Sequence, residues 1–358
     1  MVLLRRIGLG LAAPVLALVI AAVLSSLLLL STGDDVSGFW ETLFTAPKDR
    51  NVINILNYGS LLYMSGIAAA IGFRMNLFNI GVNGQYQIGF FAAAVVAGEA
   101  WLPGKANTLV AIFAAMLAGA LWAGIAGVLR VYRGVSEVIS TIMLNAIAGL
   151  LVGYLVKQWG ISSGVTTGTK PVPKNSWIGG FALFDGVPTE LYGLALLAPV
   201  LGIAYYVVLN RTRFGFDLRA TGSSESAAVA AGVDVRRMVI VTMLLSGMVA
   251  GLIGMATLFG STHNYGSSFQ SSIGFAGIAV ALLGRNHPIG IAFAALIFAF
   301  LQDRSGLLNI TAGISPEIIA VTQGIIVLAV VIAYEIVRRY RVTLEQAAVA
   351  RQVEEVRA

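Results

Sequence analysis

Residues that commonly do chemistry in proteins are scarce in this sequence. It contains no Cys and only two His, His263 and His287, which lie far apart in the chain. Structural disulfides and Cys-ligated metals are therefore excluded, and neither a His-based triad nor a His-rich metal site is expected. Charged side chains are nearly missing from the apolar segments. Glu137 lies at the end of one of them, and we expect it to form a helix-end ion pair with the nearby Arg133 rather than to act as a buried carboxylate that binds protons or ions.

Amide side chains and glycines interrupt an apolar region between Arg74 and Gln87. The stretch contains Asn76, Asn79, Gly81, Asn83, Gly84, Gln85 and Gln87. Such groups are not tolerated against lipid, but they are tolerated where they line a cavity. Two interpretations remain open, a broken helix or re-entrant turn beside a translocation path and an ordinary cytoplasmic turn between two spans. Asn145 is a further candidate for lining such a path, with an interhelical hydrogen bond as its alternative.

The polar segment 210–237 has the pattern of a short helix between two loops. Ser223 or Ser224 can cap a helix whose first turn contains Glu225, and Gly232 can end it. A short amphipathic helix of this kind is a natural docking element for a soluble partner, and a plain surface helix is the alternative. The sequence has no Gly-x-x-x-x-Gly-Lys-Ser/Thr loop, so we expect no nucleotide site of the P-loop type in this chain.

The polar segments are set in a chain that is too apolar for a soluble globular protein. Of its 358 residues, 58% are hydrophobic and 11% are charged, whereas soluble domains carry about 25% charged residues. Because a helix needs about 20 apolar residues to cross a bilayer, we predict an all-α polytopic membrane protein of about ten transmembrane helices. The predicted spans are 7–30, 53–73, 86–101, 107–129, 138–156, 191–209, 238–259, 273–284, 289–301 and 317–336.

The distribution of basic residues predicts the orientation. If the N-terminus is cytoplasmic, most of the 23 Lys and Arg residues fall on the inside, as the positive-inside rule requires. Both termini and segment 210–237 are then cytoplasmic, and segment 157–190 forms small helices or turns outside. We expect 1–337 to be a single transmembrane domain and 338–358 to be a short, charged, helical tail. A second polar stretch, 260–272, suggests an inverted five-plus-five repeat with broken helices.

Several segments of the chain resemble a known protein family. They are FNIGVNGQ (78–85), SEVISTIMLN (136–145), RATGSSESAAVAAGVDVRR (219–237), LLSGMVAGLIG (244–254) and FAGIAVALLGRNHPIG (275–290). From about residue 50 to 335 the chain resembles the permease subunits of bacterial ABC importers for ribose, other simple sugars and nucleosides, which are related to branched-chain amino acid permeases. Segments 136–145 and 275–290 are most similar to the nucleoside importer permeases. Asn83 departs from the pattern, because such permeases usually have Glu there.

The resemblance implies a set of partners. The chain would lie in the bacterial inner membrane, pair with a second permease subunit or with itself, and stand above two cytoplasmic ABC ATPase subunits. A periplasmic or lipid-anchored binding protein would deliver the small-molecule substrate. ATP would be bound by the ATPase, so we expect neither a cofactor nor enzyme activity in this chain, and no nucleic acid partner. The resemblance also implies a coupling helix whose residues are Ser224, Glu225, Ala227, Ala228, Gly232 and Arg236.

A nucleoside suits the polar stretches, because it is neutral and offers an aromatic face with several hydrogen-bonding groups. Phe78, Tyr86, Phe90 and Phe275 could supply stacking surfaces near the amides. Import of a simple sugar or a branched-chain amino acid is the alternative within the family, and a stand-alone secondary transporter is the alternative outside it. The predicted residues of the substrate path are Phe78, Asn79, Asn83, Gln85, Tyr86, Asn145 and Phe275.

Overall fold

The computed structural model describes residues 2–163 and 166–357. The chain divides into two compact units, a larger one of Pro47–Phe300 and a smaller one of Met1–Ala46 with Leu301–Ala358. The described residues are almost entirely helical, which agrees with the predicted all-α class.

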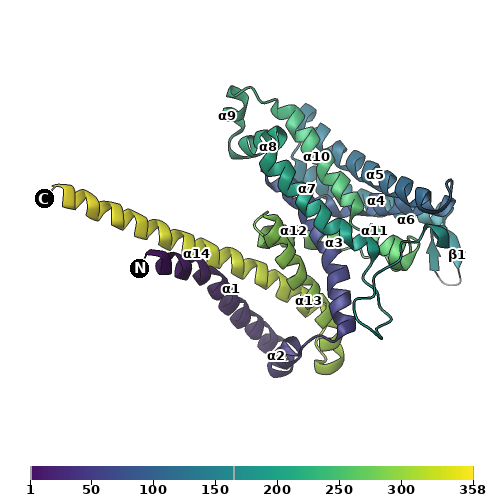
Figure 1. Cartoon of the computed structure of the whole chain (residues 1–358), viewed down its shortest axis with the longest axis horizontal. Helices are drawn as coiled ribbons and strands as arrows, with labels where there is room; N and C mark the ends of the chain where they lie inside the picture. The colour runs from purple at the N-terminus through teal and green to yellow at the C-terminus, as the bar shows by residue number, and fades with distance from the viewer. Residues whose placement is uncertain (1, 164–165, 358) are drawn as a thin grey trace. The chain divides into compact units, whose positions relative to one another are not determined.

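The smaller unit is built on two long helices that pack along each other (Figure 1). Its elements are α1 (Val2–Thr32), α2 (Val36–Phe44), the C-terminal part of α13 (Pro288–Ala312) and α14 (Pro316–Arg357). Helix α2 begins where it does because the Asp35 carboxylate accepts a hydrogen bond from the N–H of Ser37 at 2.9 Å and caps the helix. The indole N–H of Trp40 donates to the Ser26 hydroxyl at 3.0 Å, which fixes α2 against α1.

The larger unit is a helical bundle. The short helices α8 (Arg213–Ser223) and α9 (Glu225–Ala230) lie at one end of it and a β-hairpin lies at the other (Figure 1). Strands β1 (Ile161–Ser163) and β2 (Thr166–Gly168) pair antiparallel, with Ser162 opposite Thr167. The helices that precede α8 in the chain are α3 (Asp49–Phe73), α4 (Val82–Glu99), α5 (Gly104–Arg133), α6 (Glu137–Trp159) and α7 (Leu197–Arg211). The hairpin, β1 with β2, lies between α6 and α7 in the sequence. The remaining elements are η1 (Lys174–Ser176), η2 (Gly193–Leu196), α8 (Arg213–Ser223), α9 (Glu225–Ala230), α10 (Val235–Leu252), α11 (Met255–Thr257), the π-helical turn η3 (Leu258–Thr262), α12 (Ile273–Leu283) and the start of α13.

Helices α4, α5 and α10 approach each other through glycines. A β-carbon on Gly119 of α5 would lie 2.3 Å from the carbonyl oxygen of Gly247 in α10. A β-carbon on Gly251 of α10 would lie 2.2 Å from the carbonyl oxygen of Ala115 in α5. Small residues allow this backbone contact, and helices in lipid rely on such packing because burial from water does not drive them together.

Eight helical segments of the described residues are long and apolar enough to cross a membrane, which confirms the polytopic architecture. They are Val15–Thr32, Asp49–Phe73, Gly104–Arg133, Glu137–Trp159, Gly193–Arg211, Val235–Thr262, Pro288–Ala312 and Pro316–Tyr340. The other two predicted spans, 86–101 and 273–284, fall on α4, whose first turns carry amide side chains, and on α12, which has 11 residues. The total of ten spans, the side of each terminus and the inverted repeat stay predictions.

The apolar run breaks between α12 and α13, where the sequence predicts an interruption. Arg285 and Asn286 both have left-handed backbone, with φ of 53° and 54°. The Asn286 carbonyl accepts hydrogen bonds from Arg74 Nη2 and from the Tyr205 hydroxyl, each at 2.9 Å. These two donors tie the turn to α3 and α7 and hold a backbone conformation that ordinary residues rarely adopt.

Other features are not predicted by the sequence. Helix α2 and the β1–β2 hairpin lie in segments expected to be loop, or small helices and turns. The predicted tail, 338–358, is helical as far as it is described, but it continues α14 without a break rather than forming a separate element.

Candidate functional site

The amide-rich stretch begins as a tight turn and continues as the first turns of α4. Helix α3 ends at Phe73, residues 74–81 form the turn, and α4 begins at Val82. Asn76 has a φ of 58°, a left-handed conformation that Asn tolerates better than most residues. The stretch therefore supplies both irregular backbone, at Asn79, and helical positions, at Asn83 and Gln85.

Asn79 and Gln85 form a buried pair of amides that exchange two hydrogen bonds. Asn79 Nδ2 donates to Gln85 Oε1 at 3.0 Å, and Gln85 Nε2 donates to Asn79 Oδ1 at 2.9 Å. Asn79 Nδ2 also donates to the Ser246 hydroxyl of α10 at 2.8 Å, and the N–H of Gly81 donates to Asn79 Oδ1 at 3.0 Å. Both side chains are fully buried and paired, so in this conformation they brace the turn against α10.

Asn145 of α6 connects that helix to the same turn. Its Nδ2 donates to the Ile80 carbonyl at 2.9 Å, and its Oδ1 accepts from the N–H of Gly84 at 2.7 Å. The sequence left open whether Asn145 lines a path or forms an interhelical hydrogen bond. The structure shows hydrogen bonds at both ends of its amide, to the backbone on either side of the start of α4.

Asn83 lies where α4 meets the N-terminal end of α12. A β-carbon on Gly274 would lie 2.2 Å from the Cα of Asn83, so the two backbones are in contact. The Asn83 side-chain oxygen is buried and accepts no hydrogen bond from the described residues. Such an acceptor is costly to leave unpaired, and Asn83 therefore differs from Asn79, Gln85 and Asn145.

Aromatic rings from the second polar stretch pack against α4. Tyr86 stacks on Phe269 at a centroid distance of 4.9 Å, and Phe90 and Tyr265 contact the same ring at 5.3 and 4.8 Å. The Tyr265 hydroxyl accepts a hydrogen bond from Gln87 Nε2 at 2.9 Å. The stretches 74–87 and 260–272 therefore meet, and the exposed fraction of Tyr86 falls to 1%.

Phe78 and Phe275 are the most accessible of the predicted path residues, and Asn145 is half-buried. Each of the two Phe residues exposes 48% of its surface, whereas Tyr86 and Phe90 are buried in the aromatic cluster. The structure thus brings Asn79, Gln85 and Asn145 together around one turn and places Asn83 against α12. Sequence reasoning missed Tyr265, Phe269 and Ser246 individually, although the first two belong to a stretch that its polar, Gly-rich composition marks out.

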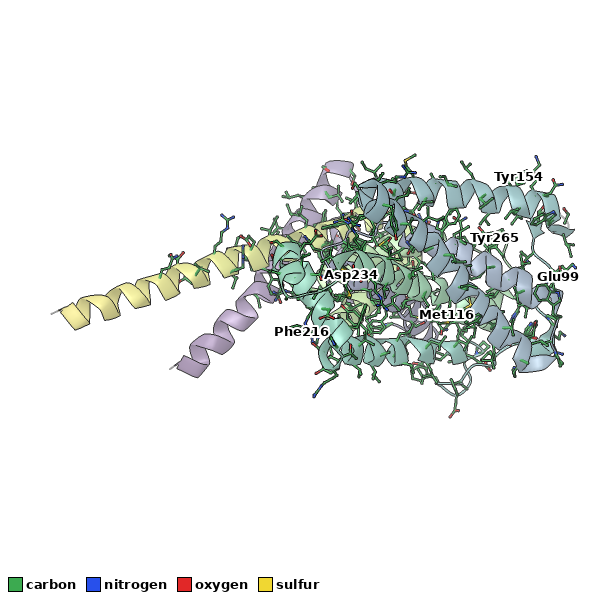
Figure 2. The ribbon with its side chains drawn as sticks, turned by 90° about the horizontal axis from the view of Figure 1, so that it is seen from above. Glu99, Met116, Tyr154, Phe216, Asp234 and Tyr265 are labelled. Atoms are coloured by element: carbon green, nitrogen blue, oxygen red, sulfur yellow. The ribbon has the colours of Figure 1, made fainter. Side chains whose placement is uncertain are left out.

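The predicted docking helix forms as expected at one end of the larger unit. Helix α9 begins after Ser224, whose hydroxyl accepts from the N–H of Ala227 at 3.3 Å, and it ends before Gly232, which has a φ of 82°. Ala228 is buried, while Ala227, Val229 and Arg236 are exposed. Figure 2 labels Phe216 and Asp234 at this end of the unit and Glu99 and Tyr265 toward the opposite end.

Glu137 pairs with Arg130 rather than with the expected Arg133. Helix α5 ends at Arg133, and Gly134, with a φ of 66°, reverses the chain toward α6. This reversal leaves Arg133 exposed and brings the Arg130 guanidinium, one turn earlier, onto the Glu137 carboxylate. The prediction that Glu137 forms a helix-end ion pair is therefore confirmed, but the predicted partner, Arg133, is wrong. Arg130 Nη2 also lies 3.5 Å from Glu225 Oε1 at the start of α9.

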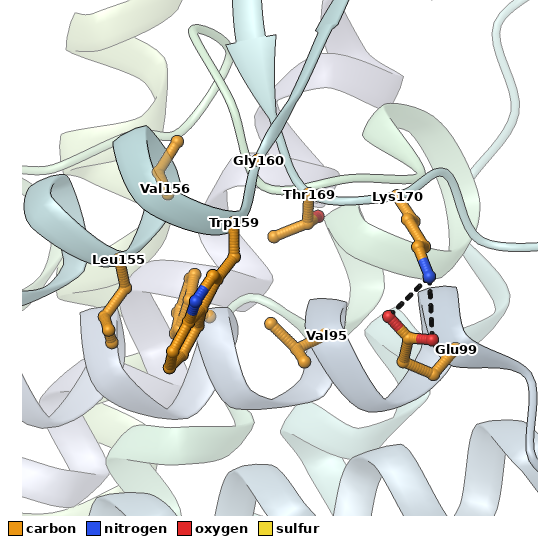
Figure 3. A pocket seen from close by; sticks show the side chains of 9 residues that line it. Val95, Glu99, Leu155, Val156, Trp159, Gly160, Thr169 and Lys170 are labelled. Carbon is orange, nitrogen blue, oxygen red and sulfur yellow. Dashed lines mark hydrogen bonds and ion pairs between the residues drawn. The ribbon is translucent and has the colours of Figure 1, made fainter.

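A small cavity lies at the opposite end of the unit, next to the hairpin (Figure 3). Its volume is about 180 Å³, and α4 and α6 form its walls with Val95, Leu155 and Trp159. Lys170 and Glu99 close one edge as an ion pair at 2.8 Å. None of the predicted path residues lines this cavity, and nothing in the sequence pattern marks it.

Comparison with characterised proteins gives relatives that match over nearly their whole length. A nucleoside ABC transporter permease protein of Lactococcus lactis is 30% identical, covering 90% of each chain. A guanosine ABC transporter permease protein of Bacillus subtilis is 30% identical, covering 90% of this chain and 93% of that protein. A glucose ABC transporter permease protein of Haloferax volcanii is 29% identical, covering 92% and 89%.

A family model matches residues 51–333, which include every predicted path and docking residue. The family is described as the permease component of the branched-chain amino acid transport system. Its boundaries agree with those expected from the sequence, from about residue 50 to 335. The chain therefore belongs to this family of ABC transporter membrane permeases.

Proposed function

We propose that this chain is the membrane-spanning permease subunit of an ATP-driven importer and forms the translocation path for nucleosides. The observation that carries the proposal is the match, at 30% identity over about nine-tenths of the chain, to permeases named for nucleoside and guanosine transport. The predicted path also has the chemistry that a nucleoside needs. Accessible rings at Phe78 and Phe275 could stack on a base, and amides lie close by.

The chain would work within a larger complex in the bacterial inner membrane. A cytoplasmic ABC ATPase would bind ATP and dock on α9, so this chain needs no cofactor of its own. A second permease, identical or related, would complete the path, and an external binding protein would deliver the substrate. Ten spans with both termini in the cytoplasm would place α9 on the inside and the β1–β2 hairpin outside.

Uptake by the assembled complex in proteoliposomes tests the substrate. We expect labelled guanosine or uridine to accumulate when ATP is enclosed with the ATPase, and unlabelled nucleoside to compete. Nucleoside uptake at the background of empty vesicles, with normal uptake of another solute, would overturn the nucleoside assignment.

Sugar import is the second candidate, because one relative of nearly equal identity is a glucose permease. The same ATP-loaded vesicles, given labelled ribose or glucose in the external medium, separate the two substrates directly. Omission of ATP separates both from a secondary transporter, since a secondary transporter would keep its uptake without ATP and lose it when the ion gradient is dissipated.

A further inference from the structure

Arg130 contacts two carboxylates that belong to different parts of the larger unit. Its Nη1 pairs with Glu137 at the start of α6, and its Nη2 lies 3.5 Å from Glu225 at the start of α9. A guanidinium can serve two acceptors at once because its donors are fixed in a planar fork, whereas a Lys ammonium is a single point charge. Arg130 is therefore the side chain through which the docking helix and α6 meet.

The two contacts of Arg130 differ sharply in their surroundings. The Glu137 side chain is 6% exposed, while that of Glu225 is 60% exposed and its contact with Arg130 is longer. Exposed pairs contribute little and are screened by salt, whereas a buried carboxylate depends on its partner. The outer contact can therefore be exchanged at small cost when another protein binds α9, while the inner one persists.

Glu137 in turn holds the turn that precedes α4. Its Oε1 accepts a hydrogen bond from the backbone N–H of Phe78 at 3.2 Å, and its other oxygen accepts from Arg130. The next residue is Asn79, which hydrogen-bonds with Gln85 and with Ser246 of α10. Three consecutive polar contacts and the peptide bond between Phe78 and Asn79 thus connect the exposed face of α9 to the residues that brace the amide-rich turn.

We propose that Arg130 and Glu137 are positioning residues that transmit the position of α9 to the turn 74–81 beside the substrate path. The proposal rests on the function proposed above, in which an ATPase binds α9. When the ATPase moves α9 or engages Glu225, the outer contact of Arg130 is lost and its guanidinium moves relative to Glu137, with which it stays paired. The hydrogen bond from Phe78 to Glu137 then tightens or loosens, and the turn changes its packing.

A labelling experiment on the chain without any ATPase tests the connection by itself. The natural sequence has no Cys, so Phe78→Cys introduces a unique thiol at an accessible position of the turn. We expect Glu225→Gln to change the rate of maleimide labelling at position 78 at least twofold, and Arg130→Gln at least threefold. Arg133→Gln, which removes an exposed charge from the same helix end, serves as the matched control and should leave the rate unchanged. Rates that stay equal in all three variants would overturn the proposal.

Transport by the whole complex tests whether the connection matters for coupling. We expect Arg130→Gln to keep co-purification with the ATPase and ATP hydrolysis while uptake falls at least tenfold, and Arg130→Lys to recover part of the uptake. In a double-mutant cycle of Glu225→Gln and Glu137→Gln, uptake by the double variant should be no lower than uptake by the more severe single variant. Losses that multiply would mean independent roles and would overturn the proposal. Failure of the wild-type chain to bind any ATPase would instead overturn the proposed function, leaving the labelling result to be judged separately.

Discussion

Gly274 packs directly on the backbone of Asn83, which joins the start of α12 to the first turn of α4. The absence of a side chain at residue 274 is what permits the contact, because a β-carbon there would lie 2.2 Å from the Cα of Asn83. The first polar stretch therefore meets α12 backbone to backbone at this point, and it meets the second polar stretch through the ring of Phe269.

We expect Gly274→Ala to destabilise the protein and impair transport. The new methyl group would meet backbone atoms that cannot rotate away, and overpacking of this kind costs about 1–3 kcal/mol. Gly153→Ala on α6 is the matched control, since its β-carbon would meet no atom within 4 Å. Thermal unfolding of both variants in detergent checks the prediction, which fails if the two unfold at the same temperature.

Asn83 and Asn145 should respond differently to replacement by Leu. The Asn83 oxygen accepts no hydrogen bond from the described residues, so Asn83→Leu removes a buried polar group without breaking a bond to that atom. We expect its stability to be kept or raised, because an unpaired buried acceptor costs about 1–3 kcal/mol. Uptake should nevertheless fall at least fivefold if the amide contacts substrate.

Asn145→Leu removes two hydrogen bonds to backbone groups of the turn. We expect a loss of about 2–6 kcal/mol, from two backbone partners left unpaired at about 1–3 kcal/mol each, together with impaired transport and unchanged ATPase binding. Unfolding temperature and uptake are measured side by side for both Leu variants. If each variant transports like the wild type, the two amides serve packing alone.

Changes in α9 should separate ATP hydrolysis from transport. Gly232 has a φ of 82°, and Pro cannot adopt it because its ring fixes φ near −65°. We expect Gly232→Pro, and the charge reversal Glu225→Lys, to reduce uptake at least tenfold while the chain still inserts and the ATPase still turns over. Arg213→Gln, an exposed charge change on the neighbouring α8, is the control. Normal transport by both α9 variants would refute a coupling role.

Protonation of His263 should lower the stability of the folded protein at mildly acidic pH. It lies outside the candidate spans, stacked on Trp177 at 3.6 Å, and burial lowers the pKa of its imidazole below the ordinary value. The unfolded chain then binds a proton at higher pH than the folded one, so this contribution is present above about pH 6.5 and is lost as pH falls through the lowered pKa. We expect the unfolding temperature to decrease slightly between pH 7 and 5, and His263→Phe, which keeps the stacking, to reduce that decrease. An equal decrease in the variant would exclude His263 as its source.

Much of the fold follows from local signals in the sequence. Apolar length predicts where the helices lie, and the interruption at Arg285 and Asn286 falls where charged and amide residues break the run. The cap at Ser224 and the end at Gly232 define α9 because both act within a few residues of the chain. Helix α2 and the β1–β2 hairpin escape such reasoning, since neither is long enough to show a periodicity.

The site is less predictable, because its partners come from distant segments. Sequence proximity favours Arg133 as the partner of Glu137, and only the reversal of the chain at Gly134 shows that Arg130 is the residue that reaches it. Composition likewise identifies the amides of 74–87 but not which of them are paired. The two hydrogen bonds between Asn79 and Gln85 depend on how α4 packs against α10 and α12, and so does the unpaired oxygen of Asn83.

Helix α14 has a further consequence through its length. It runs unbroken from Pro316 to Arg357, and 42 residues at 1.5 Å each give about 63 Å, roughly twice the thickness of the hydrocarbon core of a bilayer. If α14 crosses the bilayer perpendicular to its plane, about half of the helix therefore projects into water. Any tilt of the part inside the lipid would be carried to the C-terminal end of α14 as a larger sideways displacement.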